Sequence, residues 1–142
     1  MKTLPILPAL FFILLLSGCN KNSDLTGDSS FRFNDTFQLL INKSAVNNEN
    51  QLSIRIDSVL NDSRCPSDVV CAWEGNAEVR FILTNGESET KFVLNTHGGD
   101  NFRKDTIIDG CSILFVDLKP YPVSTKEISN NEYVAELLIK KK

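Results

Sequence analysis

The sequence has few of the residues on which metal binding and acid–base catalysis depend. Its 142 residues include one histidine, one tryptophan and one methionine. A structural zinc site needs four ligands, commonly in close pairs such as Cys-x2-Cys. Cys65 and Cys71 are separated by five residues, and the single histidine, His97, lies far along the chain from them. There is also no Gly-x-Ser-x-Gly nucleophile motif. We therefore predict no catalytic residues, no metal site and no other cofactor.

The sequence also lacks a long apolar run and a sustained helical period. The run from Ile6 to Leu16, interrupted only by Pro8, is about half as long as the roughly 20 residues that a membrane-spanning helix needs. Net charge is −3, and no basic face is evident. Nucleic acid is therefore not an expected partner.

The N-terminal segment has the features of a secretory signal. Lys2 precedes the apolar run, and Leu16-Ser17-Gly18-Cys19 follows it. A charged residue, a short apolar core and small residues in this order are typical of a cleaved signal peptide. The last four of these residues resemble the lipobox of bacterial lipoproteins. The resemblance implies cleavage before Cys19, a diacylglycerol thioether on its sulfur, and further acylation by a fatty acid such as palmitate.

The expected lipid anchor at Cys19 and the composition of residues 20–30 together suggest the domain organisation. Several acyl chains would hold a protein firmly on a membrane, because each buried methylene contributes about 0.8 kcal/mol. Residues 20–30 are rich in Asn, Ser, Asp and Gly, which favours a flexible tether. In enterobacterial lipoproteins, Asp directly after the cysteine retains the protein at the inner membrane, so the resemblance to a lipobox implies that Asn20 favours the outer membrane. We predict a signal peptide at 1–18, a lipidated cysteine and tether at 19–30, and one β-domain at 31–142.

The domain shows the period of two that β-strands produce. Apolar and polar residues alternate in 37–41, 52–57, 77–84 and 133–139. Asn85-Gly86 predicts a type I′ turn that joins strands of about 77–84 and 87–95 into a hairpin.

Two later segments complete the predicted fold. Residues 112–118 contain four consecutive apolar residues, which predicts a strand buried on both faces, and residues 96–110 are expected to form a loop. About six or seven strands predict an all-β fold, either an antiparallel sandwich or a small barrel.

The connection from Asp62 to Ala77 is the most distinctive stretch. It contains Cys65, Cys71 and Trp73. Export permits disulfides, so we predict a Cys65–Cys71 bridge that closes a short loop. The bridge either stiffens a recognition loop or only fastens a long connection. A lone tryptophan beside a disulfide is usually a packing residue, so the sequence favours burial of Trp73.

A resemblance supports the importance of this stretch. Ser63-Arg64-Cys65-Pro66, followed by Cys71, Trp73, Gly75 and Ala77, resembles a signature of small bacterial lipoproteins from Bacteroidota. The similarity extends over about residues 57–140, including Pro120-Tyr121-Pro122 and Tyr133. It implies a lipid-anchored β-domain, and it implies no reaction.

These observations favour a non-enzymatic binding or interaction module of the cell envelope, held on the membrane through Cys19. The candidate binding residues are Arg64, Asp68, Trp73 and Glu74, because loops on rigid scaffolds often carry recognition. The alternative is a thiol-based redox or metal-binding envelope protein. Cys111 directly precedes the 112–118 strand. In a binding module it is expected to be a small core residue, whereas in a redox or metal-binding protein it would be a reactive group.

Overall fold

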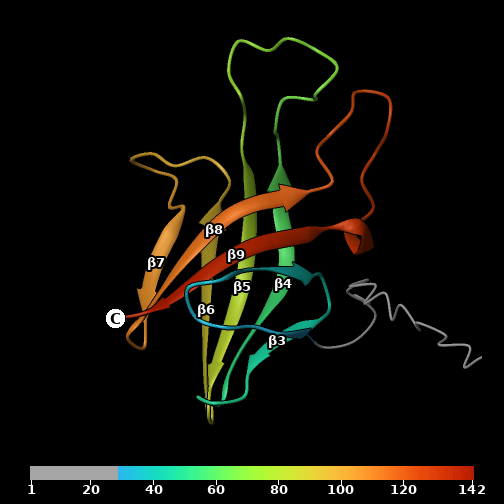
Figure 1. Ribbon diagram of the computed structural model, residues 1–142. Helices are drawn as coiled ribbons and strands as arrows, with labels where there is room; N and C mark the ends of the chain where they lie inside the picture. The colour runs from blue at the N-terminus through green and yellow to red at the C-terminus, as the bar shows by residue number, and fades with distance from the viewer. Residues whose placement is uncertain (1–28) are drawn as a thin grey trace, which may run out of the picture.

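The protein, described here by a computed structural model over residues 29–142, folds as two β-sheets that pack face to face (Figure 1). The strands are β1 (Ser29–Ser30), β2 (Thr36–Leu40), β3 (Ser44–Asn47), β4 (Leu52–Asp62), β5 (Ala77–Asn85), β6 (Ser88–Asn95), β7 (Asp105–Ile108), β8 (Cys111–Lys119) and β9 (Val134–Lys141). One sheet has the order β1-β3-β4-β5-β6, and the other has the order β2-β9-β8-β7. Neighbouring strands are antiparallel except for β1 and β3. The all-β prediction is confirmed, and the arrangement is the sandwich rather than the small barrel.

The core lies between the two sheets because the alternating apolar residues point inward. Phe81 of β5 and Phe115 of β8 meet edge to face across the interior, with ring centroids 5.4 Å apart. Both side chains are fully buried. Leu39, Ile54, Leu94, Ile113, Leu137 and Ile139 are among the buried residues around them. Burial of each such side chain contributes about 1.5–3 kcal/mol, so the period-two pattern accounts for the pairing of the sheets.

Three strands were missing from the sequence prediction. Ser29 and Ser30 pair with Ala45 and Val46, so β1 and β3 extend the first sheet. β1 begins two residues before the expected start of the domain at residue 31. β7 lies inside 96–110, which was expected to be a loop. All three strands have four residues or fewer, which is too short for an alternating pattern to stand out.

The hairpin turns also differ from expectation. The hairpin of β5 and β6 is confirmed, but its two-residue loop is Gly86-Glu87, and Asn85 pairs with Ser88. Only Gly86 of the two has positive φ, at 59°, which is the pattern of a type II′ turn and not type I′. The two positive φ values of a type I′ turn occur instead at Asp109 and Gly110, between β7 and β8.

β8 is not buried on both faces as predicted. Its residues alternate between buried and half-buried up to Phe115, and then Val116 and Asp117 are both half-buried. The register shifts between Phe115 and Asp117, which marks a β-bulge. A bulge re-aims side chains, and here it turns two successive residues away from the core.

The expected signal peptide, Cys19 and the tether as far as residue 28 lie outside the described residues. Within residues 29–142, no helix has the length and apolar character needed to span a bilayer.

Candidate binding surface at one end of the sandwich

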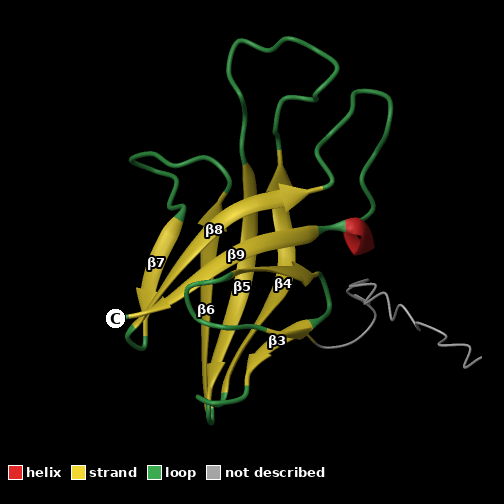
Figure 2. Ribbon diagram, in the orientation of Figure 1, coloured by secondary structure: helices red, strands yellow, loops and turns green. Residues whose placement is uncertain are grey.

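Three long connections gather at one end of the sandwich (Figures 1 and 2). They are 63–76 between β4 and β5, 96–104 between β6 and β7, and 120–133 between β8 and β9. We call these three segments together the loop end. The loop that was singled out from the sequence is therefore one part of a larger surface.

The 63–76 loop continues the β4–β5 ladder before it opens. Ser63 N–H donates to the carbonyl of Asn76 at 2.8 Å, and Cys65 N–H donates to the carbonyl of Glu74 at 2.9 Å. Gly75 lies between these acceptors with φ of +74°. A Cβ at this position would lie 2.0 Å from the carbonyl oxygen of Ser63. Only glycine permits the two backbones to approach so closely.

The predicted Cys65–Cys71 disulfide is present and closes the outer part of this loop, with Cα atoms 6.0 Å apart. Cys71 is exposed and Cys65 is half-buried. The bridge therefore constrains the outer residues of the loop, and the backbone ladder holds its base.

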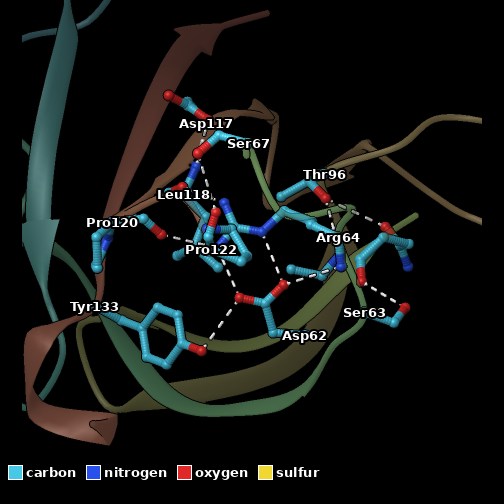
Figure 3. A network of polar contacts seen from close by, with 12 residues as sticks. Asp62, Ser63, Arg64, Ser67, Thr96, Asp117, Leu118, Pro120, Pro122 and Tyr133 are labelled. Atoms are coloured by element: carbon cyan, nitrogen blue, oxygen red, sulfur yellow. Dashed lines mark hydrogen bonds and ion pairs between the residues drawn. The ribbon is translucent and has the colours of Figure 1, made fainter. Parts of the chain in front are cut away.

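Arg64 is buried, which differs from its prediction as a binding residue. Its guanidinium donates to both carboxylate oxygens of Asp62, from Nε at 2.8 Å and from Nη2 at 2.6 Å. It also donates to the carbonyls of Leu118 and Pro120 in the opposite sheet and its loop. Figure 3 shows Arg64 at the centre of these contacts. A buried guanidinium needs this full set of acceptors, so Arg64 fastens the two sheets together.

Asp62 completes this buried network. The hydroxyl of Tyr133 donates to its Oδ2 at 3.2 Å (Figure 3). Burial disfavours the charged form, but the hydrogen bonds and charge of Arg64 outweigh it and lower the pKa of the Asp62 carboxyl. Burial, together with the charge of Asp62, raises the pKa of Tyr133 to about 12. At neutral pH the network is therefore an ion pair with a neutral phenol.

Asp68, a second predicted binding residue, joins two loops. Its carboxylate accepts a hydrogen bond from the backbone N–H of Ser124 at 2.8 Å and another from the Ser124 hydroxyl. Nearby, the N–H of Ser67 donates to the carbonyl of Pro122 at 2.9 Å. These contacts fix the 63–76 loop to the 120–133 loop, so Asp68 shapes the surface and its oxygens are already engaged.

A buried amide pair fixes the third loop. The Asn76 side chain donates to the Asn95 side chain at 2.7 Å, and its oxygen accepts from the N–H of His97 at 3.1 Å. The N–H of Ala77 donates to the hydroxyl of Thr96 at 2.8 Å. The start of the 96–104 loop is thus held against the 63–76 loop.

Trp73 is exposed, which corrects the expectation that it packs in the core. Its exposed fraction is 55%. The ring meets the His97 ring edge-on, with centroids 6.3 Å apart. Glu74 is also exposed, and its Oε1 lies 2.5 Å from Nδ1 of His97. Of the four predicted binding residues, Trp73 and Glu74 therefore face solvent side by side, and His97 joins them.

Most of the large apolar side chains that face solvent in residues 29–142 belong to the loop end. Those in the loop end are Val69, Val70, Trp73, Phe102, Tyr121 and Val123. Outside it, the exposed residues of this kind are Leu60, near the end of β4, and Ile107 of β7. Clustered exposed apolar side chains on a folded domain often mark an interaction site.

Two hollows adjoin at this end. One, of about 180 Å³, is lined by Glu74, His97 and Lys104 among others, and the shallower second, of about 680 Å³, by Lys119, Lys126 and Glu132 among others. Asp117 and Tyr121 line both hollows. Asp117 reaches both hollows because the bulge in β8 turns its side chain away from the core.

The free thiol found within residues 29–142 is remote from this surface. Cys111 is buried at the start of β8 and is free, and burial raises its pKa. β8 runs from Cys111 to Lys119, which at about 3.3 Å per residue places Cys111 at the opposite end from the disulfide. Within residues 29–142, no three His, Cys, Asp or Glu side chains are grouped so that they could hold a metal ion.

Sequence reasoning missed several residues of this surface. Lys104 comes close to Asp117 and Tyr121 only when β7 pairs with β8, where the N–H of Phe115 donates to the carbonyl of Lys104 at 3.0 Å. Tyr121 had a weak signal, since Pro120-Tyr121-Pro122 places an aromatic residue in a rigid turn. Lys104 and Asp117 had none.

The comparisons with known proteins give no match: no protein-family model, no curated protein and no solved structure resembles this chain.

Proposed function

We propose that this protein is a membrane-anchored, non-enzymatic binding module of the bacterial cell envelope, and that the loop end is its binding surface. The observation that carries the proposal is the exposure of Trp73 on a loop that is otherwise firmly held. An exposed tryptophan loses contact with water when a partner covers it, and tryptophan is over-represented among residues that dominate binding.

Rigidity supports the same proposal. The 63–76 loop is fixed by a disulfide, by the buried Asp62–Arg64 pair, and by bonds to both neighbouring loops. A surface that is ordered before binding loses less conformational entropy when the partner arrives.

The test is recovery of envelope partners with the intact protein and with two variants. Trp73→Ala should lose partners that the wild type retains. Ile107→Ala is the matched control, because Ile107 has the same exposed fraction of 55% but lies on β7, outside the loop end. Identical partner lists for wild type and Trp73→Ala would contradict the proposal.

The anchor is tested separately. We propose that Cys19 carries the lipid and that the protein resides at the outer membrane. Cells fed labelled palmitate should label the wild type but not Cys19→Ser, and the wild type should fractionate with outer-membrane markers. Label on the Cys19→Ser variant, or a wild type that washes off membranes with salt, would contradict this part.

A further inference from the structure

The two hollows at the loop end adjoin at Asp117 and Tyr121, which line both of them. We call the two adjoining hollows together the Tyr121 groove. The smaller hollow, about 180 Å³, has the volume of about six water molecules at roughly 30 Å³ each. That space suits one six-membered sugar ring, and the adjoining hollow provides room for more.

The ring of Tyr121 is held in place and partly exposed. The guanidinium of Arg64 lies 5.0 Å from the centroid of its ring, and 47% of the residue remains exposed. Arg64 is itself fixed by Asp62 and by the carbonyls of Leu118 and Pro120. The ring is therefore supported by a rigid cation on one side and still presents aromatic surface to the groove.

Trp73 supplies a second exposed aromatic surface next to the groove, outside the residues that line it. It is the neighbour of Glu74 and meets the His97 ring, and both of these residues line the groove. Flat apolar rings combine a large contact area with little loss of side-chain freedom. The C–H faces of a sugar ring are apolar and match such surfaces.

The polar residues of the groove balance in charge. Glu74, Asp117 and Glu132 oppose Lys104, Lys119 and Lys126, and the buried Arg64 is paired with Asp62. A groove with no dominant sign does not concentrate an ion of either charge. Carboxylates, ammonium groups and an imidazole can instead accept from and donate to neutral hydroxyl groups.

The groove offers few aliphatic side chains for an apolar peptide to cover. Those in its lining are Val116 and Pro120. The most exposed aliphatic residues of the loop end, Val69 and Val70, are not among the residues that line the groove.

We propose that the Tyr121 groove binds a neutral saccharide chain of at least two sugar units, with Tyr121 and Trp73 stacking on successive rings. This inference rests on the proposed binding function and gives it a ligand class.

The test is calorimetric titration of the full acylated chain with four neutral tetrasaccharides: cellotetraose, maltotetraose, mannotetraose and chitotetraose. A zwitterionic detergent keeps the protein in solution without offering sugar head groups as competitors. We expect at least one of the four to bind with a dissociation constant below about 1 mM. Absence of saturable heat for all four at about 5 mM would overturn the inference.

Three variants locate the site. Tyr121→Ala should weaken the affinity at least about tenfold, whereas Tyr121→Phe, which keeps the ring, should stay within about threefold. Ile107→Ala should bind as the wild type. Circular dichroism establishes that each variant is folded. Binding that is unchanged by Tyr121→Ala would place the saccharide elsewhere and also overturn the inference.

The two proposals can fail separately. If Trp73→Ala loses envelope partners but no tetrasaccharide binds, the loop end remains a binding surface and the saccharide inference is wrong. If tetrasaccharides bind at Tyr121 and partner recovery is unaffected by Trp73→Ala, the groove binds sugars without the wider surface that we propose.

Discussion

The guanidinium of Arg64 binds both carboxylate oxygens of Asp62, two residues earlier in the chain, at 2.8 and 2.6 Å. Their side chains are only 3% and 9% exposed. The pair joins the end of β4 to the backbone of Leu118 and Pro120 across the sandwich. It thus connects the stability of the domain to the shape of its loop end.

Removal of one partner from this pair should be strongly destabilising. Asp62→Ala leaves the Arg64 charge buried without its counter-ion, and such a change typically costs about 3–5 kcal/mol. Urea unfolding measures the loss. The control is Asp57→Ala, because Asp57 pairs with Arg55 and Arg80 on the surface, where exposed pairs contribute less than about 1 kcal/mol. Equal losses for the two variants would contradict the role assigned to Asp62.

The same pair predicts an acid-dependent loss of stability. The pKa of Asp62 is lower in the folded protein than its ordinary value of 3.8, so its contribution is fully present above about pH 4. It disappears as the pH falls through the lowered folded pKa. We expect the stability difference between wild type and Asp62→Asn to shrink below about pH 4 in urea unfolding series. A difference that stays constant from neutral pH to about pH 2 would contradict this.

Gly75 and Gly86 form a matched pair of substitutions. Both have positive φ, but a Cβ at Gly75 meets the Ser63 carbonyl oxygen at 2.0 Å, whereas a Cβ at Gly86 has no heavy atom within 4 Å. Gly86→Ala should therefore lose only about 1 kcal/mol of conformational energy. Gly75→Ala should lose more than about 2 kcal/mol, since the backbone must also move. Thermal or urea unfolding of both variants measures this, and similar losses would show that the close approach at Gly75 is unimportant.

The disulfide should matter locally rather than globally. Replacement of both cysteines by Cys65→Ser and Cys71→Ser removes a constraint worth about 2 kcal/mol in loop-closure entropy. The base of the loop stays held by the ladder at Ser63 and by Arg64. Amide hydrogen exchange should therefore accelerate in residues 69–73 and stay unchanged near Arg64. Loss of protection throughout β4 and β5 would show that the bridge supports the whole domain.

The strand pattern could be predicted because its cause is local. Alternation in β4, β5 and β9 follows from one face meeting the core, and this face is visible in the sequence. β7 was not predicted because its four residues include only two large apolar side chains. The Asp109-Gly110 dipeptide that follows them is a hairpin signal and would have located this strand.

The site was harder to predict because its contacts are distant in sequence. Arg64 stands in a polar loop and looks like a surface residue, but two of its acceptors are the carbonyls of residues 54 and 56 positions later. Trp73 looked like a core residue because it neighbours a disulfide, yet the interior is already filled by residues of the two sheets such as Phe81 and Phe115. The burial of Arg64 depends on the position of the end of β8, and no local pattern reveals it.

Site-specific photocrosslinking in living cells tests the central claim, that the loop end is the binding surface, most directly. Val70→p-benzoylphenylalanine places the reactive group on a fully exposed residue of the 63–76 loop, and Glu87→p-benzoylphenylalanine places it on the exposed β5–β6 turn, outside the loop end. We predict a discrete adduct from position 70 that is absent from position 87. The same adducts from both positions, or none from position 70, would contradict the account.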